Sequence, residues 1–102
     1  MKYKVRFPSH SIEKKFDISL SRILPVNIQD RVMLEIEELA NNPRPFDKKL
    51  FKQLKPPIQV YRFSAQYRLR IGDYRVLYDV DDKRKIVWIL TLRKRSEKTY
   101  KY

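Results

Sequence analysis

The sequence has no cysteine and a single histidine, and each scarcity excludes a kind of site. Without cysteine the chain has no disulfide, no thiolate zinc site and no thiol nucleophile. With His10 as its one histidine, one chain cannot supply a histidine-pair nuclease or a histidine-rich metal site. The chemistry open to this protein therefore has to come from other side chains.

Long apolar stretches are also missing. The longest strongly apolar run, Ile86 to Leu90, is far shorter than the ~20 residues that span a bilayer. The first ten residues contain no apolar stretch typical of a signal peptide. We therefore expect a soluble, cytoplasmic protein that has no membrane partner.

Positive charge is what the sequence has in excess. Its 102 residues, enough for one small domain, include 24 Lys and Arg against 12 Asp and Glu, which gives a net charge of +12. Hydrophobic residues make up 42%, too many for a disordered basic tail. A basic folded domain is typical of nucleic-acid binding, although charge that only aids solubility is the alternative. Charge alone separates neither RNA from DNA nor an enzyme from a binder.

Apolar periodicity predicts the first half of the fold. Alternation from Lys2 to Phe7 predicts a half-buried strand, and Ser9 can cap the helix that follows. Two stripes at helical spacing then predict two helices, separated by Pro25 and joined as a hairpin. Residues 43–57 contain four prolines and read as a loop that carries a basic cluster, including Lys49 and Lys52.

The second half of the chain predicts a sheet. Alternation over residues 58–63 can begin a strand, and residues 67–71, 74–81 and 86–92 form three consecutive strands. The last of these is apolar on both faces and should lie centrally. The expected class is α+β: an N-terminal strand, a two-helix hairpin, then an antiparallel strand meander, forming one twisted sheet with the helices packed on one face.

The hairpin around Gly72 and Asp73 places arginines together. A two-residue loop fixes the register, so Arg70 faces Arg75 and Arg68 faces Leu77. One face is apolar and should lie under the helices: Tyr67, Leu69, Ile71, Tyr74, Val76, Tyr78 and Val80. The other, open face collects Arg68, Arg70, Arg75, Leu77 and Asp79. Opposed like charges are destabilising, so the cluster can serve to hold an anion, unless acids neutralise it or the guanidiniums splay into water.

The segment from Tyr67 to Tyr100 resembles the RelE/ParE superfamily of toxin–antitoxin modules, specifically its RelE branch. The shared pattern is a tyrosine and two basic residues alternating on a strand, a short glycine-containing turn, and Tyr-Arg opening the next strand. An apolar strand, a basic cluster and a tyrosine follow. The resemblance implies one RelE-like toxin domain over residues 1–102 with a microbial-RNase-type fold.

The resemblance also implies an activity. RelE-type toxins are ribosome-associated endoribonucleases that cut mRNA by attack of the 2′-hydroxyl on the adjacent phosphate, without metal or other cofactor. The implied partners are mRNA, the ribosome with its rRNA, and a cognate antitoxin. The toxin alone is expected to be a monomer, and its complex with the antitoxin a hetero-oligomer.

Site residues carry over position by position. Arg68 and Arg70 match the two basic strand positions, and Arg75 matches the arginine after the turn. The late basic position falls on Arg93, Lys94 or Arg95, and the stacking tyrosine on Tyr100. The expected catalytic set is thus Arg68, Arg70, Arg75, Lys94, Arg95 and Tyr100, with RNA binding by Arg93, Lys98, Lys49 and Lys52.

The chain departs from the family pattern in one respect. Several family members carry lysines where this chain has Arg68 and Arg70, and arginine cannot accept a proton at physiological pH. We therefore take Lys94 as the candidate general base. Two alternatives stay open: a ParE-like, non-enzymatic inhibitor of DNA gyrase, and an inactive RNA- or ribosome-binding module of the same fold.

Overall fold

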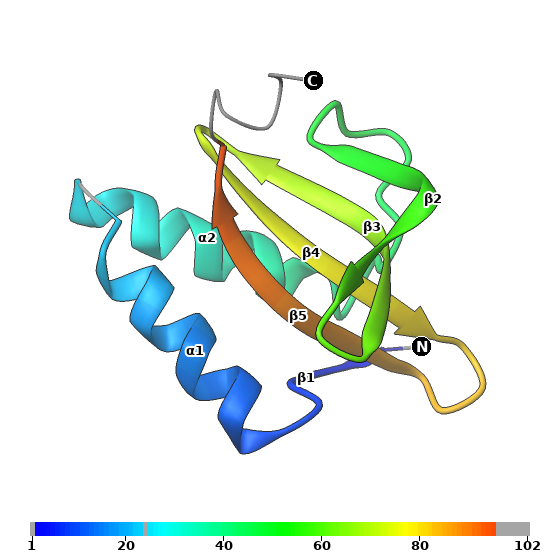
Figure 1. The fold of residues 1–102 in the computed structure, drawn as a ribbon. Coiled ribbons are helices and arrows are strands. Elements are labelled where there is room, and N and C mark those ends of the chain that lie inside the picture. Colours follow the sequence, from blue (N-terminus) through cyan, green and yellow to red (C-terminus); the bar gives the residue numbers. More distant parts are fainter. Residues whose placement is uncertain (1, 24, 96–102) are drawn as a thin grey trace.

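A five-stranded sheet carries both helices on one of its faces in the computed structural model, which describes residues 2–23 and 25–95 (Figure 1). In chain order the elements are β1 (Lys4–Arg6), α1 (His10–Ser21), α2 (Val26–Glu38), β2 (Phe51–Val60), β3 (Phe63–Ile71), β4 (Tyr74–Asp81) and β5 (Ile86–Lys94). The strand order is β1-β5-β4-β3-β2. Strands β2 to β5 form an antiparallel meander, and β1 pairs with β5 in parallel. The expected α+β class is confirmed, and β5 is an interior strand, as expected, flanked by β1 and β4.

Each helix presents one apolar stripe to the sheet. Ser9 accepts a hydrogen bond from the backbone N–H of Ile12, which caps α1 as expected. Ile12 and Phe16 are the buried residues of α1, and Val32 and Ile36 those of α2. Their spacing of four residues repeats once per turn, so they line one side of each helix. Among the described residues, neither helix has the length and apolarity to cross a membrane.

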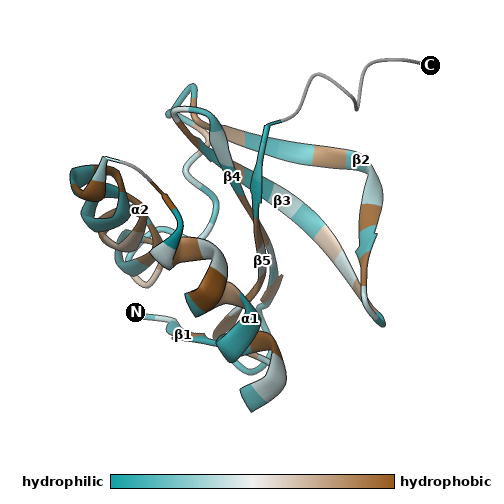
Figure 2. Ribbon diagram, turned by 60° about the vertical axis from the view of Figure 1, so that its left-hand side comes forward, coloured by the Kyte–Doolittle hydropathy of each residue, from teal (hydrophilic) through white to brown (hydrophobic). Residues whose placement is uncertain are grey.

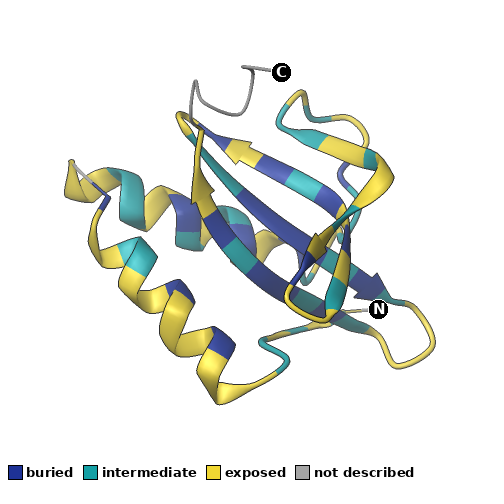
Figure 3. Cartoon of the chain, viewed as in Figure 1, coloured by how far each residue is buried: buried dark blue, intermediate teal, exposed yellow. Residues whose placement is uncertain are grey.

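The predicted hairpin register and its apolar face are confirmed. Ile71 lies opposite Tyr74, Arg70 opposite Arg75, and Leu69 opposite Val76. Gly72 begins the turn with φ +59°, a left-handed conformation that glycine adopts without a Cβ penalty. All seven residues of the predicted apolar face join the main core: Tyr67, Leu69, Ile71, Tyr74, Val76, Tyr78 and Val80. Figure 3 shows the buried positions running along the central strands.

The loop predicted over residues 43–57 is wrong from Phe51 onward. Strand β2 begins there and continues through Pro56 and Pro57. Since β2 is the edge of the sheet, a proline nitrogen there removes no hydrogen bond to an outer neighbour. The pairing with β3 also shifts register between Gln53 and Ile58, so the prolines fall where the ladder is interrupted.

A second, smaller core covers part of the sheet face that the sequence predicts to be open. Val60, Ala65, Leu77 and Leu90 are its buried members. Strand β2 and the adjoining part of β3 project away from the helices on that side of the sheet, as Figure 2 shows. The face that carries the arginines is therefore a trough with one sheltered end, and the expectation of a wholly open surface is corrected.

Candidate nucleic-acid interface

Three arginines from three neighbouring strands form a line across the face away from the helices. Arg75 on β4 pairs with Arg70 on β3 and with Arg93 on β5. Because directly opposed residues of antiparallel strands point to the same face, the three side chains leave the sheet together. We call Arg70, Arg75 and Arg93 the arginine row. The structure thus brings Arg93 into the cluster that the sequence assigned to Arg68, Arg70 and Arg75.

A second line of residues runs beside the arginine row. Arg68 on β3 pairs with Lys52 on β2 and with Leu77 on β4, and Leu77 pairs with Thr91 on β5. Lys52 is exposed and Arg68 is half-buried. These pairings place five cationic side chains, from four adjacent strands, on one face.

The members of the arginine row differ in their exposure. Arg70 and Arg93 are exposed, whereas Arg75 between them is half-buried. The Nε atom of Arg75 is enclosed and has no hydrogen-bond partner within the described ranges 2–23 and 25–95. Arg70 donates from Nε to the carbonyl oxygen of Gly72 over 3.4 Å, a long hydrogen bond.

The ion pairs in the described part of the chain do not neutralise the arginine row. The salt bridges found in the described part of the chain join Arg44 to Asp82, Lys48 to Glu35 and Arg84 to Asp81, so none involves the row. Arginine stays protonated at any physiological pH. A partly desolvated guanidinium flanked by two exposed ones is an arrangement suited to a phosphate or another oxyanion.

The structure does not bring Lys94 to the arginine row. Lys94 pairs with Tyr74, and both face the helix side of the sheet, where they line a hollow of about 270 Å³ with Ser19 and Arg22. Successive residues of a strand point to opposite faces, so Arg93 and Lys94 diverge. The assignment of Lys94 as general base is therefore corrected.

The remaining predicted site residues are Arg95, Lys49, Tyr100 and Lys98. Arg95 is exposed directly after β5, and its backbone N–H donates to the carbonyl oxygen of Asp73. Lys49 is exposed next to Leu50, whose carbonyl oxygen accepts from the backbone N–H of Arg70. Tyr100 and Lys98 lie outside the described residues.

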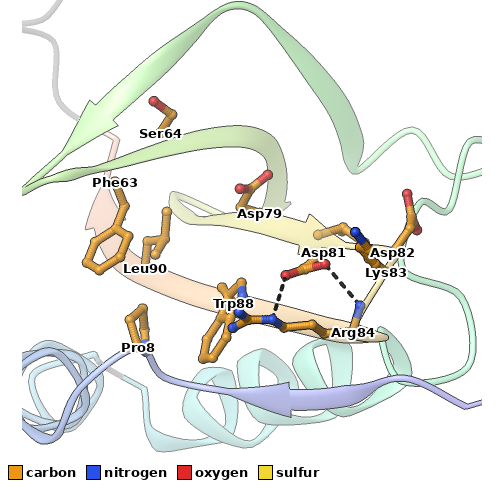
Figure 4. A pocket seen from close by; sticks show the side chains of 11 residues that line it. Pro8, Phe63, Ser64, Asp79, Asp81, Asp82, Lys83, Arg84, Trp88 and Leu90 are labelled. Atoms are coloured by element: carbon orange, nitrogen blue, oxygen red, sulfur yellow. Dashed lines mark hydrogen bonds and ion pairs between the residues drawn. The ribbon is translucent and has the colours of Figure 1, made fainter.

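A hollow of about 680 Å³ opens on the same face as the arginine row, at the far end of β4 (Figure 4). Its lining includes Asp79, Trp88 and Leu90, none of which the sequence singled out as a site residue on its own. A register shift between Leu77 and Tyr78 places Trp88 opposite Asp79. The sequence carries no visible signal for that bulge, which explains why the hollow was missed.

A polar cluster on the helix side of the sheet holds the segment after α2 against the sheet, and only its Asp82 also lines the hollow. Arg44 donates two hydrogen bonds to the carboxylate of Asp82, at 3.0 and 2.8 Å, and a third from Nε to the hydroxyl of Tyr67 at 2.7 Å. These bonds, that to Asp82 foremost, raise the pKa of Arg44, and the guanidinium lowers the pKa of Asp82 to about 2. Burial raises the pKa of Tyr78, which donates to the carbonyl oxygen of Pro43 at 2.7 Å.

Within the described ranges, no group of three or more His, Asp or Glu side chains is arranged as it would be around a metal ion. The guanidinium and ammonium groups of the described face can bind, orient and stabilise negative charge.

Comparison with known proteins places the chain in a family. The family model for the ParE toxin of the type II toxin–antitoxin system parDE matches residues 14–99. Among solved structures, the archaeal RelE–RelB complex from Pyrococcus horikoshii matches with 29% identity and a TM-score of 0.69, over 95% of this chain and 99% of that chain. A doubly substituted Escherichia coli RelE in the free state is 19% identical and shares the fold, with a TM-score of 0.59 over 98% of this chain and 92% of that chain. No curated protein sequence gave a match. By its family match and its fold, the chain belongs to the RelE/ParE superfamily of type II toxins.

Proposed function

We propose that this toxin is an endoribonuclease that cleaves mRNA on the ribosome. The observation that carries the proposal is the arginine row, in which a half-buried Arg75 stands between two exposed arginines. Guanidinium groups bind the oxygens of a phosphate in a bidentate manner and hold charge where it develops during reaction. The similarity to RelE of P. horikoshii over almost the whole chain supports the same assignment.

The proposed reaction breaks one ester bond and forms another. The 2′-oxygen of a ribose attacks the adjacent phosphorus, and the bond from phosphorus to the 5′-oxygen of the next nucleotide breaks. The 2′-hydroxyl gives up a proton, the departing 5′-oxygen takes one, and the products end in a 2′,3′-cyclic phosphate and a 5′-hydroxyl. Arg75 stabilises the extra negative charge on the pentacoordinate phosphorus, while Arg70 and Arg93 orient the neighbouring phosphates.

Proton transfer has to involve a group other than the arginines. Lys52 lies opposite Arg68 on the same face, and a lysine, unlike an arginine, can exist without its proton. Comparison of Lys52→Arg with Lys52→Ala distinguishes a role of Lys52 as a positive charge from a role as the proton acceptor. If only its charge matters, Lys52→Arg keeps the wild-type rate and pH profile. If it accepts the proton, both variants lose activity equally.

Primer extension on translated mRNA tests the nuclease proposal. Wild-type protein is expected to produce discrete cleavage ends, and Arg75→Ala to reduce cleavage by about 10²–10³-fold, the usual effect of removing one group that stabilises a transition-state charge. Arg31→Ala is the matched control, because Arg31 is an exposed arginine on α2 and its loss changes the net charge equally. Intact message with the wild-type protein, or full cleavage by Arg75→Ala, contradicts the proposal. RNA binding without cleavage indicates an inactive binding module.

Inhibition of DNA gyrase is the second candidate function, because the matching family model is that of ParE toxins. A supercoiling assay separates the two candidates. Inhibition of gyrase by the wild-type protein, together with uncut message on translating ribosomes, favours the ParE activity.

We also propose a cognate antitoxin as partner. The related P. horikoshii structure is a complex of RelE with RelB, and this chain offers the strongly basic face that an acidic partner segment would neutralise. Co-expression with the neighbouring small open reading frame is expected to relieve toxicity and to convert a monomer into a hetero-oligomer. Toxicity that persists would remove the support for this partner.

A further inference from the structure

The turn between β2 and β3 departs from the usual chemistry of a tight hairpin. Val60 pairs with Phe63, so Tyr61 and Arg62 form a two-residue loop. Tyr61 has φ +57°, a left-handed conformation that such loops usually assign to Gly, Asn or Asp, because a bulky side chain raises its energy. The chain therefore carries an aromatic side chain at a position where the backbone favours other residues.

Packing does not account for the tyrosine at this position. Tyr61 is 51% exposed, and among the described residues it belongs to neither hydrophobic core. Its ring contacts Lys15 of α1, whose Nζ lies 4.6 Å from the ring centroid. An exposed cation–π contact is weak, and a left-handed backbone at a bulky residue costs about as much as the contact gains. A local rule broken for so little structural gain indicates a function of the side chain.

Neighbouring side chains hold the turn in place. The side-chain amide of Gln59 donates a hydrogen bond to the carbonyl oxygen of Tyr61 over 3.3 Å. The hydroxyl of Ser64 in turn donates to Oε1 of Gln59 over 3.5 Å, a long hydrogen bond. The backbone that carries the ring is thus ordered before any ligand arrives, which lowers the entropic cost of binding.

The charged groups around the ring are positive. Lys15 and Arg62 are both exposed, and none of the salt bridges in the described part of the chain involves either of them. A ring beside two uncompensated cations suits an unpaired stretch of RNA, whose bases stack on aromatic rings while its phosphates pair with the cations. An acidic protein segment would be attracted by the same cations, but it has no need of a flat ring in a strained turn.

The tip of the β2–β3 hairpin lies far from the arginine row. Phe63 and Arg70 are seven residues apart on β3, which is about 23 Å at the usual rise per residue. Figure 1 shows the turns before and after β3 at opposite ends of this strand. A trinucleotide bound at the row is too short to occupy both places, whereas a longer strand or a ribosome can do so. The hairpin tip is therefore separate from the proposed site of cleavage.

We propose that the tip of the β2–β3 hairpin is a second RNA contact, in which Tyr61 stacks on an unpaired base while Lys15 and Arg62 bind the neighbouring phosphates. This proposal rests on the proposed action on RNA and adds a contact that holds the RNA away from the cleaved bond. The unpaired base belongs either to a single-stranded message or to ribosomal RNA, and the two sources are separated by the choice of probe.

Substitution of the ring tests the contact with two probes: a labelled oligouridine of twenty nucleotides, followed by fluorescence anisotropy, and ribosomes without mRNA, followed by sedimentation. Tyr61→Asn is expected to weaken binding about tenfold, the usual effect of removing one stacking ring, and Tyr61→Phe to bind as wild type does. Binding of a uridine trinucleotide should not change. Weakening with the oligouridine identifies single-stranded RNA as the ligand, and weakening with ribosomes alone identifies ribosomal RNA.

The stability of the same variants shows whether the ring has a structural role instead. Asparagine tolerates the left-handed conformation, so Tyr61→Asn should unfold at the wild-type temperature or above it. A lower unfolding temperature would mean that the ring serves to hold α1, and it would overturn the proposal. Phe46→Leu is the matched control, because Phe46 is an aromatic residue that is 71% exposed and lies in the segment before β2.

Three further outcomes contradict the contact. The first is unchanged binding of both probes by Tyr61→Asn, and the second is equal weakening by Phe46→Leu. The third is a loss in Tyr61→Phe as large as that in Tyr61→Asn, because stacking does not need the hydroxyl. If Tyr61→Asn weakens only the complex with the product of the neighbouring open reading frame, the tip is a protein interface and the proposal is wrong.

The arginine row separates failure of this proposal from failure of the nuclease. Arg75→Ala is expected to lose RNA cleavage, while its affinity for one of the two probes still falls when Tyr61→Asn is added. Wild-type protein that cleaves RNA, with binding that does not depend on Tyr61, removes the hairpin contact alone. Binding that depends on Tyr61 without any cleavage removes the nuclease and leaves the hairpin contact standing.

Discussion

Arg70 and Arg75 lie directly opposite one another on β3 and β4, and both point to the face of the sheet that carries no helix. Two like charges in this position repel each other, and Arg93 on β5 extends the repulsion to a third strand. The described salt bridges leave all three uncompensated. The repulsion among the three arginines therefore destabilises the fold locally, and a bound polyanion would relieve it.

Removing one member of the row is expected to stabilise the protein while it impairs function. Arg70→Gln should raise the free energy of unfolding by about 0.2–1 kcal/mol at low salt, because it ends one cross-strand repulsion. The gain should shrink at 1 M salt, where exposed charges are screened. Urea denaturation at both salt concentrations measures this, with Arg31→Gln as the control of equal charge. A variant less stable than wild type at low salt would show that the repulsion is already compensated.

Binding to single-stranded RNA is expected to depend steeply on salt. A slope of about −0.7 in log affinity against log salt accompanies each phosphate that the protein neutralises on a single strand. Arg93→Gln should therefore make the slope shallower by about 0.7, and Arg75→Gln by a similar amount. Fluorescence anisotropy with a labelled oligonucleotide over a salt series gives the slope. If Arg31→Gln changes the slope as much as Arg93→Gln does, the binding is diffuse and the row is not its centre.

The sequence predicts the hairpin in detail because its short turn determines the register of the two strands. Gly72 and Asp73 form a two-residue loop, and a one-residue slip would move Leu69 and Val76 from the core to water. The register that follows places Arg70 opposite Arg75, as found. The length of the turn and the burial of the apolar residues favour the same register. The central part of the candidate site could therefore be predicted from the sequence.

Other parts of the site depend on features that local patterns do not report. The prolines at 56 and 57 read as loop, since the sequence does not say that β2 is an edge strand. The sequence predicts that the last strand ends at Leu92, whereas β5 continues to Lys94. Arg93 and Lys94 are therefore part of the strand and point to opposite faces of the sheet. The register shift beside Tyr78 brings Trp88 opposite Asp79, and that pairing depends on tertiary packing.

Tyr78 is expected to stabilise the segment that follows α2. Its ring is fully buried in the core, and its hydroxyl donates to the carbonyl oxygen of Pro43 at 2.7 Å. Tyr78→Phe keeps the ring but leaves that carbonyl without its donor, which should lower the free energy of unfolding by about 1–2 kcal/mol. Thermal or urea denaturation measures the loss. Tyr61→Phe should have no effect, because Tyr61 is exposed, and an equal loss in both variants would argue against a specific role for the bond to Pro43.

Asp82 is expected to contribute to the acid sensitivity of the fold. Hydrogen bonds from Arg44, and from the Tyr3 hydroxyl at 2.6 Å, lower the pKa of Asp82 to about 2 from its ordinary 3.8. A carboxylate whose pKa is lower in the folded state stabilises the fold above its unfolded value, and this stabilisation is lost as the pH falls through the folded value. Wild-type protein should therefore exceed Asp82→Asn in stability by a constant margin from pH 5 to 7, and the margin should disappear between about pH 4 and 2.

Urea denaturation across this pH range measures the margin, with Asp47→Asn as the control, since Asp47 is an exposed carboxylate in the segment before β2. The control should track wild type at every pH. A margin for Asp82→Asn that persists at pH 2 would mean that the ionised carboxylate is not what holds Arg44, and that the asparagine perturbs the β4–β5 turn in another way. A margin absent at pH 7 would mean that water replaces the ion pair without cost.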